Sequence, residues 1–404
     1  MSLKSLSFAA VLLATLCSSP ALAQMGPPQP LPAEALVDPV DPAKAAWLRA
    51  HTVIDGPVSG GLTFALPDRF YRSKLILLGE SHGVAAPQIL DFELLRHLND
   101  RIGLTDYVAE VDPVQGDRLN HYLETGDAAA LDRVFDHWSR AGAQWGNTAF
   151  EDKMRRIRSL NQTLPAERRI RFIGIDAIQD WPLVGEWLTS QGRDVDLSSA
   201  SNADKARAAL AALDGLDGPA VPRLRGVLER VAQGRDRESV IFETYAQAVR
   251  SGELGGRPAY GLWGMFHAMQ GPVNGARPFA ARVRESDLPT ADAVATLVVL
   301  SLDSAVQIPV PTPEGVQRMR LDKFNIDGPF VMVRGASTLR AASEPGRITL
   351  FDSAAPGSPL TGADFLKVQT SVGQNFDLDP GAPQGRYAQY LGVFRNSDWA
   401  PPRE

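Results

Sequence analysis

The fold is decided by one stretch of nine residues, Leu75-Ile76-Leu77-Leu78-Gly79-Glu80-Ser81-His82-Gly83. Four consecutive apolar residues cannot alternate between core and solvent, so this run predicts a strand buried on both faces, as in a parallel sheet. Ligands of open α/β sheets bind beyond the carboxyl ends of the strands. We therefore expect Glu80 and His82 to lie at a site; an ordinary turn between strand and loop is the alternative.

The same arrangement returns at three later strand ends. Each of these predicted strands finishes on an acid or an imidazole: Glu110 and Asp112 at the end of 106–112, Asp176 at the end of 171–176, and His267 at the end of 260–267. Carboxyl ends of parallel strands lie at one edge of a sheet, so these groups are expected to meet in a single cleft. Strands that alternate with helical stretches predict an α/β fold, with a mostly parallel sheet and helices on both faces.

The remaining elements follow from composition and periodicity. Residues 203–250 are rich in Ala, Leu and Arg, which predicts a helical insertion at about 195–250 that is either a structural cap or a lid. Later strands are expected at 293–302, 330–333 and 348–351, and an irregular surface tail from about Phe376. The charged run 151–158 is interpreted as a solvated helix face.

The beginning of the chain predicts export. Residues 1–23 combine one positive charge, a short apolar run and the small residues Ala21-Leu22-Ala23, which is the pattern of a signal peptide cleaved near Ala23. A Pro/Ala-rich leader at 24–42 and one α/β hydrolase-like catalytic domain at 43–404 would follow. The expected location is periplasmic or secreted, with no membrane anchor. Cys17, the only cysteine, falls in the removed segment, so the mature chain would lack disulfides and thiol nucleophiles.

Charge and residue types narrow the function classes. The 404-residue chain has 41 basic and 47 acidic side chains, and this modest acidity argues against nucleic acid as a partner. No protein partner is evident, and a small-molecule substrate is expected. A histidine with a nearby carboxylate can take a proton from water, and clustered carboxylates shift one another's pKa. That set could hydrolyse an ester, amide or lactone without a covalent nucleophile; Ser81 lacks the Gly-x-Ser-x-Gly elbow that would favour it as one.

Several residues carry specific expectations. The spacing Gly-x-x-His occurs twice, at Gly79–His82 and Gly264–His267, where a glycine would let a ligand approach the backbone. Asp112, Asp176 and Arg96 are candidates for substrate binding, although Arg96 is equally compatible with an exposed helix. No cofactor is predicted. Two histidines and a carboxylate could hold a catalytic zinc, but the spacing does not match a His-Glu-x-x-His helix.

These motifs resemble the erythromycin esterase family. The resemblance rests on Leu78-Gly79-Glu80-Ser81-His82-Gly83, on Val108-Ala109-Glu110, on Phe172-Ile173-Gly174-Ile175-Asp176 and on Gly264-Met265-Phe266-His267, and it covers about 74–270. It implies hydrolysis of an ester or lactone, with His82 as the base, Glu80 and Glu110 as active-site carboxylates and His267 as the second histidine. The family's acid after the first histidine is replaced here by Gln88.

The leading hypothesis is therefore an exported, metal-independent hydrolase of an ester or lactone. His82 would activate water, Glu80 and Glu110 would orient the base and the water, and His267 would bind or polarise the carbonyl. The wider group to which the resemblance points also includes Tiki-type metalloproteases and haem-binding uptake proteins. A metal-dependent peptidase and a non-catalytic haem- or ligand-binding protein therefore stay open as alternatives.

Overall fold

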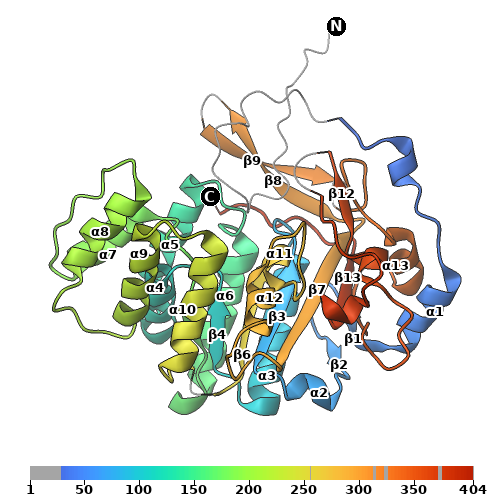
Figure 1. Ribbon diagram of the computed structural model, residues 1–404, viewed down its shortest axis with the longest axis horizontal. Coiled ribbons are helices and arrows are strands. Elements are labelled where there is room, and N and C mark those ends of the chain that lie inside the picture. The colour runs from blue at the N-terminus through green and yellow to red at the C-terminus, as the bar shows by residue number, and fades with distance from the viewer. Residues whose placement is uncertain (1–28, 255, 313–314, 323–325, 372–374, 404) are drawn as a thin grey trace, which may run out of the picture.

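The centre of the molecule is a nine-stranded sheet with the order β2-β1-β11-β13-β7-β3-β6-β4-β5. The computed structural model (Figure 1) describes residues 29–254, 256–312, 315–322, 326–371 and 375–403. The strands of this sheet are β1 Thr52–Pro57, β2 Thr63–Phe64, β3 Leu75–Glu80, β4 Asp106–Ala109, β5 Arg171–Gly174, β6 Ala259–Gly264, β7 Val294–Leu302, β11 Arg347–Asp352 and β13 Tyr390–Arg395.

The sheet is parallel from β13 to β5, and β11, β1 and β2 extend it antiparallel at one side. The fold is therefore α/β with a mostly parallel sheet, as the sequence predicts. β3 lies between β6 and β7, and Glu80 at its end pairs in register with Gly264. The ends of β3 and β6 thus bring both Gly-x-x-His segments side by side.

Helices cover both faces of the sheet, and the side chains of β3 show why the strand is apolar throughout. Ile76 and Leu78 pack into the cluster formed with α3, α4 and α6, whereas Leu75 and Leu77 pack on the opposite face with α10 and α12. The longer helices are α1 Pro42–Ala50, α3 Ala86–Ile102, α4 Pro113–Thr125, α5 Ala128–Arg140, α6 Thr148–Thr163, α7 Trp181–Ser190, α8 Asn202–Ala212, α9 Val221–Ala232 and α10 Arg237–Arg250. The shorter ones are α2 Asp68–Tyr71, α11 Met265–Ala268, α12 Phe279–Arg284, α13 Ala336–Ala342 and α14 Gly362–Phe365.

The segment between β5 and β6 contributes α7 to α10, which gather at one side of the molecule (Figure 1). α8 and α9 pack against each other, and α10 returns along the sheet to pack on α12. Asp236 is the N-cap of α10, because its side chain accepts a hydrogen bond from the backbone N–H of Ser239. The cap fixes the first residues of α10 beside the carboxyl ends of the strands.

Outside the main sheet lie two smaller ones. β8 Ala305–Thr312 and β9 Gly315–Asp322 form a hairpin, and β10 Val331–Val333 pairs with β12 Val368–Thr370. The predicted strand at 330–333 thus exists but belongs to a separate sheet. The expected irregular tail is wrong: β13 is buried almost throughout and lies inside the main sheet, between β11 and β7.

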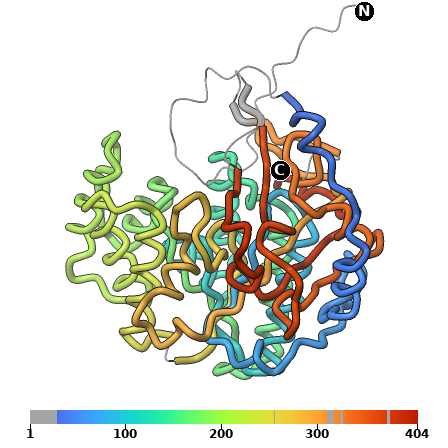
Figure 2. The backbone as a smooth tube through the Cα atoms, turned by 45° about the vertical axis from the view of Figure 1, so that its right-hand side comes forward, coloured from blue at the N-terminus to red at the C-terminus, as the bar shows by residue number. Residues whose placement is uncertain are grey.

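The N-terminal end of the described chain lies close to the sheet's antiparallel side, whereas Arg403 at the C-terminal end pairs with Asp132 of α5 and Glu151 of α6. The N-terminal segment runs beside the C-terminal third (Figure 2), and α1 packs on α13. In the leader, Leu31 and Leu36 pack against that part of the core, and Asp38 accepts hydrogen bonds from the backbone of Gly335 and Ser337. The predicted signal peptide at 1–23 lies outside the described residues. Among the helices that the structure describes, none has the length and apolar character needed to cross a membrane.

Candidate active site

The carboxyl ends of β3, β4 and β6 converge on Gly264. A Cβ atom built on this glycine would lie 3.3 Å from Nε2 of His82, 3.4 Å from Cδ2 of His267 and 3.6 Å from Oε2 of Glu110. A side chain at this position would therefore press against two imidazoles and a carboxylate, and glycine allows these three groups to lie close together. The sequence prediction that these distant groups meet in one place agrees with this geometry.

The two glycines of the Gly-x-x-His segments have different tasks. Gly264 lets His82, His267 and Glu110 lie close together around its backbone. At Gly79, in contrast, a Cβ would lie 2.9 Å from the Cβ of Ala268, so this glycine allows α11 to pack closely on β3. Only the first of these roles concerns the residues of the candidate site.

His82 is held by Glu80, two residues earlier. Its Nδ1 lies 2.6 Å from Oε1 of Glu80, and the Glu80 side chain is only 4% exposed. Nε2 of His82 is buried and has no hydrogen-bond partner among the described residues. When the imidazole is neutral, Nδ1–H donates to the carboxylate and Nε2 presents a lone pair. The ring of Trp145 contacts the imidazole edge to face, with 5.1 Å between centroids.

Glu110 is tied from several sides. Oε2 accepts a hydrogen bond of 2.6 Å from the backbone N–H of Gly264, and Oε1 accepts one of 2.8 Å from Arg237. Nε2 of His267 lies 3.4 Å from Oε1 of the same carboxylate. These contacts fix the carboxylate in one orientation at the end of β4.

Arg237 was not foreseen from the sequence, and it lies at the centre of the charged groups. Its Nε and one terminal nitrogen bind both oxygens of Asp176, at 2.9 and 2.6 Å, while it also reaches Glu110 and lies 3.2 Å from Nε2 of His267. The next residue, Glu238, has Oε1 at 2.6 Å from Nδ1 of His267. Both residues belong to the first turn of α10. The helical insertion therefore supplies part of the site and is more than a cover.

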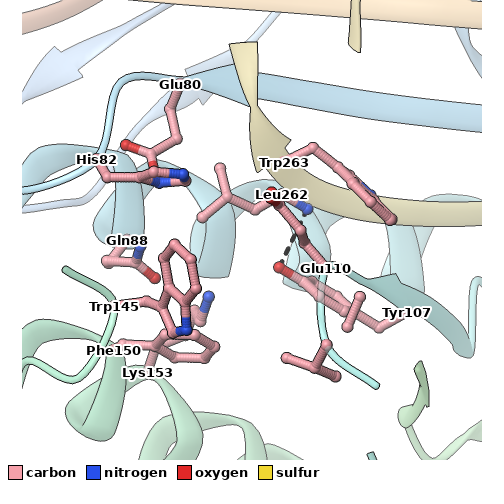
Figure 3. A pocket seen from close by; sticks show the side chains of 12 residues that line it. Glu80, His82, Gln88, Tyr107, Glu110, Trp145, Phe150, Lys153, Leu262 and Trp263 are labelled. Carbon is pink, nitrogen blue, oxygen red and sulfur yellow. Dashed lines mark hydrogen bonds and ion pairs between the residues drawn. The ribbon is translucent and has the colours of Figure 1, made fainter. Parts of the chain in front are cut away.

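A narrow cavity of about 40 Å³ opens beside His82. Figure 3 shows its wall, with Gln88, Trp145, Phe150 and Lys153 gathered on one side and Glu110, Tyr107 and Trp263 on the other. The complete lining is Glu80, His82, Gln88, Tyr107, Ala109, Glu110, Val111, Trp145, Phe150, Lys153, Leu262 and Trp263. A cavity of this volume with several polar groups is large enough for water.

Burial and charge shift the pKa values of the site in opposite directions. Burial alone lowers the pKa of His82, but the charge and hydrogen bond of Glu80, helped by Glu110, raise it above its ordinary value. Burial also lowers the pKa of His267, but the charges of Glu238 and Glu110 outweigh burial and raise this pKa above its ordinary value. At Glu110 burial raises the pKa, yet His267 and Arg237 bring it down to about 2. Glu110 is therefore a permanent anion here.

The predicted substrate-binding residues lie around this core without lining the cavity. Asp176 is 0% exposed and pairs with Arg237, and Asp112 is 1% exposed and caps α4 through the N–H groups of Val114 and Gln115. Arg96 points away: its half-exposed side chain pairs with Glu93 on α3, so it does not reach the cavity. His267 is 1% exposed and lies behind Glu110.

Gln88 and Lys153 are further polar side chains of the cavity wall. Gln88 is 6% exposed and its Oε1 has no partner among the described residues. The expectation of a solvated face at 151–158 is wrong at Lys153, which is 2% exposed. Lys153 falls in the helical register of the buried Phe150, Met154 and Ile157, a signal that could have located it.

Within the described residues, no group of three or more His, Cys, Asp or Glu side chains is arranged to hold a metal ion. Other polar atoms at the cavity bind protein groups through hydrogen bonds. Nε2 of His82, Oε2 of Glu80 and Oε1 of Gln88 are buried in the cavity wall without a partner among the described residues.

Comparison with known proteins identifies the fold. No protein-family model matches the chain, and no curated protein matches its sequence. Among solved structures, a Bacillus cereus protein determined by structural genomics has a TM-score of 0.61 at 14% identity, covering 91% of this chain and 100% of its own. A succinoglycan biosynthesis protein has a TM-score of 0.59 at 12% identity, covering 89% and 98%.

The third similar structure has an activity in its name. A mutant of the erythromycin esterase EreC in its open conformation has a TM-score of 0.55 at 14% identity, covering 82% of this chain and 93% of its own. At such identities the likeness establishes a shared α/β fold. The chain is thus similar in fold to an esterase and to two proteins whose names give no such activity.

Proposed function

We propose that this protein hydrolyses a small ester or lactone with a water molecule activated by His82. The observation that carries the proposal is the cavity of about 40 Å³ lined by His82, Glu80 and Glu110, where Nε2 of His82 is buried without a partner among the described residues. A water in this cavity can donate one hydrogen to the imidazole and the other to a carboxylate oxygen. General-base catalysis needs this hydrogen-bond reach.

The surrounding groups support the same chemistry. Glu80 fixes the tautomer of His82 and stabilises the imidazolium that forms when water gives up its proton. Glu110, anionic at all working pH values, aligns the water, and Arg237 pairs with both Glu110 and Asp176. His267 orients Glu110 and Arg237 from a buried position, so its contribution is to the geometry of these two groups.

The reaction follows from this arrangement. The activated water attacks the carbonyl carbon while its proton passes to Nε2 of His82, which gives a tetrahedral intermediate. The intermediate collapses, the bond to the leaving oxygen breaks, and His82 returns the proton to that oxygen. An acid and an alcohol result from an ester, and a hydroxy acid results from a lactone. The fold shared with an esterase supports this reaction class.

The test is a panel of small esters and lactones assayed with the purified chain and with His82→Asn, which keeps the ring's approximate size and removes the base. We expect hydrolysis by the wild type and a loss of at least ~10²-fold in kcat/KM in the variant. His121→Asn is the matched control, because His121 is half exposed and far from the cavity lining. Full activity of His82→Asn would contradict the proposal. Loss of wild-type activity on adding a chelator would contradict it as well.

Export is proposed separately. The signal-peptide pattern at 1–23 predicts a mature chain that begins near Gln24 in the periplasm or medium. Mass spectrometry of the chain recovered from the periplasmic fraction would test this, since a cytoplasmic chain that keeps Met1 to Ala23 would contradict it.

A further inference from the structure

Lys153 is a buried cation whose position the proposed mechanism has not used. Lysine ammonium groups are rarely fully buried, because removing the charge from water is costly. Lys153 is nevertheless 2% exposed, on the face of α6 that packs against the sheet, and it lines the same cavity as His82 and Glu80. A buried charge at a reaction cavity calls for an explanation.

The ammonium group is held in place by a polar network beneath the cavity. Its Nζ donates to Oδ2 of Asp91 at 2.6 Å, and the same carboxylate accepts hydrogen bonds from the hydroxyls of Tyr107 and Tyr260 at 2.7 and 2.6 Å. Nζ also lies 3.8 Å from the centroid of the Phe150 ring. Asp91 is 0% exposed, so the carboxylate that holds the ammonium group is shielded from solvent.

The pairing favours the charged form of Lys153. Burial lowers the pKa of Lys153 below its ordinary value, and the charge and hydrogen bond of Asp91 offset part of this effect. An ammonium has three N–H groups, and the hydrogen bond to Asp91 uses one of them. Lys153 also lines the cavity, so its remaining N–H groups can serve a ligand there.

No other Lys or Arg side chain lines this cavity in the described part of the chain. Arg237 is the nearest alternative, but its guanidinium is engaged by Asp176, Glu110 and His267 and does not belong to the cavity wall. Ester hydrolysis moves a full negative charge onto the carbonyl oxygen, and donors fixed in advance at that position supply a large part of the rate enhancement.

We infer that Lys153 is a catalytic residue that donates a hydrogen bond to the carbonyl oxygen of the substrate and stabilises the oxyanion. This inference rests on the proposed hydrolase function and deepens it. Water adds to the carbonyl carbon, its proton moves to His82, and the π electrons of the carbonyl move to the oxygen facing Lys153. When the electrons return, the leaving oxygen departs and takes the proton from His82.

The first test separates chemistry from binding. Lys153→Met removes the charge and keeps the length, and it should reduce kcat by ~10² to 10³-fold, with a much smaller change in KM. Because Lys153→Met leaves Asp91 without its cation, the double variant Asp91→Asn/Lys153→Met serves as the folded reference, in which neither charge remains. It should be as inactive as the single variant. Lys74→Met, at the amino end of β3, removes an exposed ammonium and should leave kcat unchanged.

The second test measures binding and begins with the wild-type protein. A phosphonate monoester carries the negative tetrahedral oxygen of the intermediate, and a phosphonate diester of the same shape is neutral. Calorimetry with the wild type should show tighter binding of the monoester, by at least ~10-fold, and Lys153→Met should abolish that preference. Equal affinity of the wild type for both compounds would overturn the inference.

The outcomes distinguish this inference from the proposed function. Ester hydrolysis that depends on His82 but is retained in the double variant overturns the role of Lys153 and leaves the function intact. Absence of any hydrolysis together with absence of phosphonate binding overturns both. A monoester preference that requires Lys153, in a chain that hydrolyses nothing, supports an anion-binding role for Lys153 and rejects the hydrolase function.

Discussion

Nδ1 of His82 and Oε1 of Glu80 lie 2.6 Å apart, between residues separated by only one position in the chain. This carboxylate raises the pKa of the imidazole against the effect of burial. His82 serves as a base only when it is neutral, so activity should fall as the pH drops through a value above the ordinary histidine pKa of about 6.5.

Glu80→Gln tests that coupling. Without the carboxylate's charge, burial is the larger effect, and the pKa of His82 should move down. The acidic limb of kcat/KM against pH should therefore shift to lower pH, while the maximum rate falls because the imidazolium loses its partner. An unshifted limb, measured over pH 4–9, would show that another group controls it.

Gly264→Ala should displace the imidazole of His82. The new Cβ would lie 3.3 Å from Nε2 of His82, which is tighter than ordinary van der Waals contact, while the backbone φ of −52° accepts alanine without strain. We expect at least ~10-fold loss of kcat with little change in melting temperature. Gly185→Ala is the control, since its Cβ would meet only Leu197, at 3.6 Å. Unaltered activity in Gly264→Ala would show that the rate does not depend on the exact position of His82.

Arg237→Met should destabilise the fold as well as the site. The change leaves the buried carboxylates of Asp176 and Glu110 without their shared cation, and breaking such a pair costs about 3–5 kcal/mol. Urea unfolding followed by circular dichroism measures the loss. Arg235→Met removes a half-exposed arginine that pairs with Glu243, and a much smaller cost is expected there, because exposed ion pairs contribute little to stability. If both variants lost the same free energy of unfolding, Arg237 would not be the residue that stabilises these buried carboxylates.

Asp112 should make the protein less stable as the pH rises. Burial, with help from Asp180 and Asp176, raises its pKa to about 7, whereas the unfolded chain has the ordinary value of 3.8. The folded state therefore holds its proton more tightly. Stability should fall between pH 3.8 and about 7, by up to ~1.4 kcal/mol per pH unit from this group.

Asp112→Asn checks this effect because asparagine caps helices as well as aspartate does. The variant should lose the slope that Asp112 contributes between pH 4 and 7 and should be at least as stable as the wild type at pH 8. Chemical unfolding at a series of pH values provides the measurement. An unchanged slope would assign the pH dependence to other groups.

The local sequence pattern was sufficient to predict the strands that carry the candidate site. The apolar run 75–78 and the acids or imidazoles at the ends of β3, β4 and β6 could be read directly, because strand burial on both faces leaves a continuous apolar signature. The convergence of His82, Glu110 and His267 followed from the geometry of parallel sheets alone.

The charged partners could not be predicted in the same way. Arg237 and Glu238 come from a helix whose composition is ordinary, and only the path of α10 across the sheet brings them to Asp176 and His267. Lys153 was missed for another reason. The many charged residues in 151–158 suggested a solvated helix face, although Lys153 shares a helical face with the buried Phe150 and Met154. β13 was missed because the Gly- and Pro-rich residues before it suggested surface.

β13 comes later in the chain than every other strand of the main sheet, yet it occupies an interior position between β11 and β7. Until β13 has been synthesised, the half of the sheet that carries His82 and Glu110 therefore ends at β7, whose edge is unpaired. During that time β1 and β11 are not joined to this half of the sheet. Assembly depends on contacts between residues about a hundred positions apart, so we expect slow folding and sensitivity to aggregation until residues 390–395 have been made.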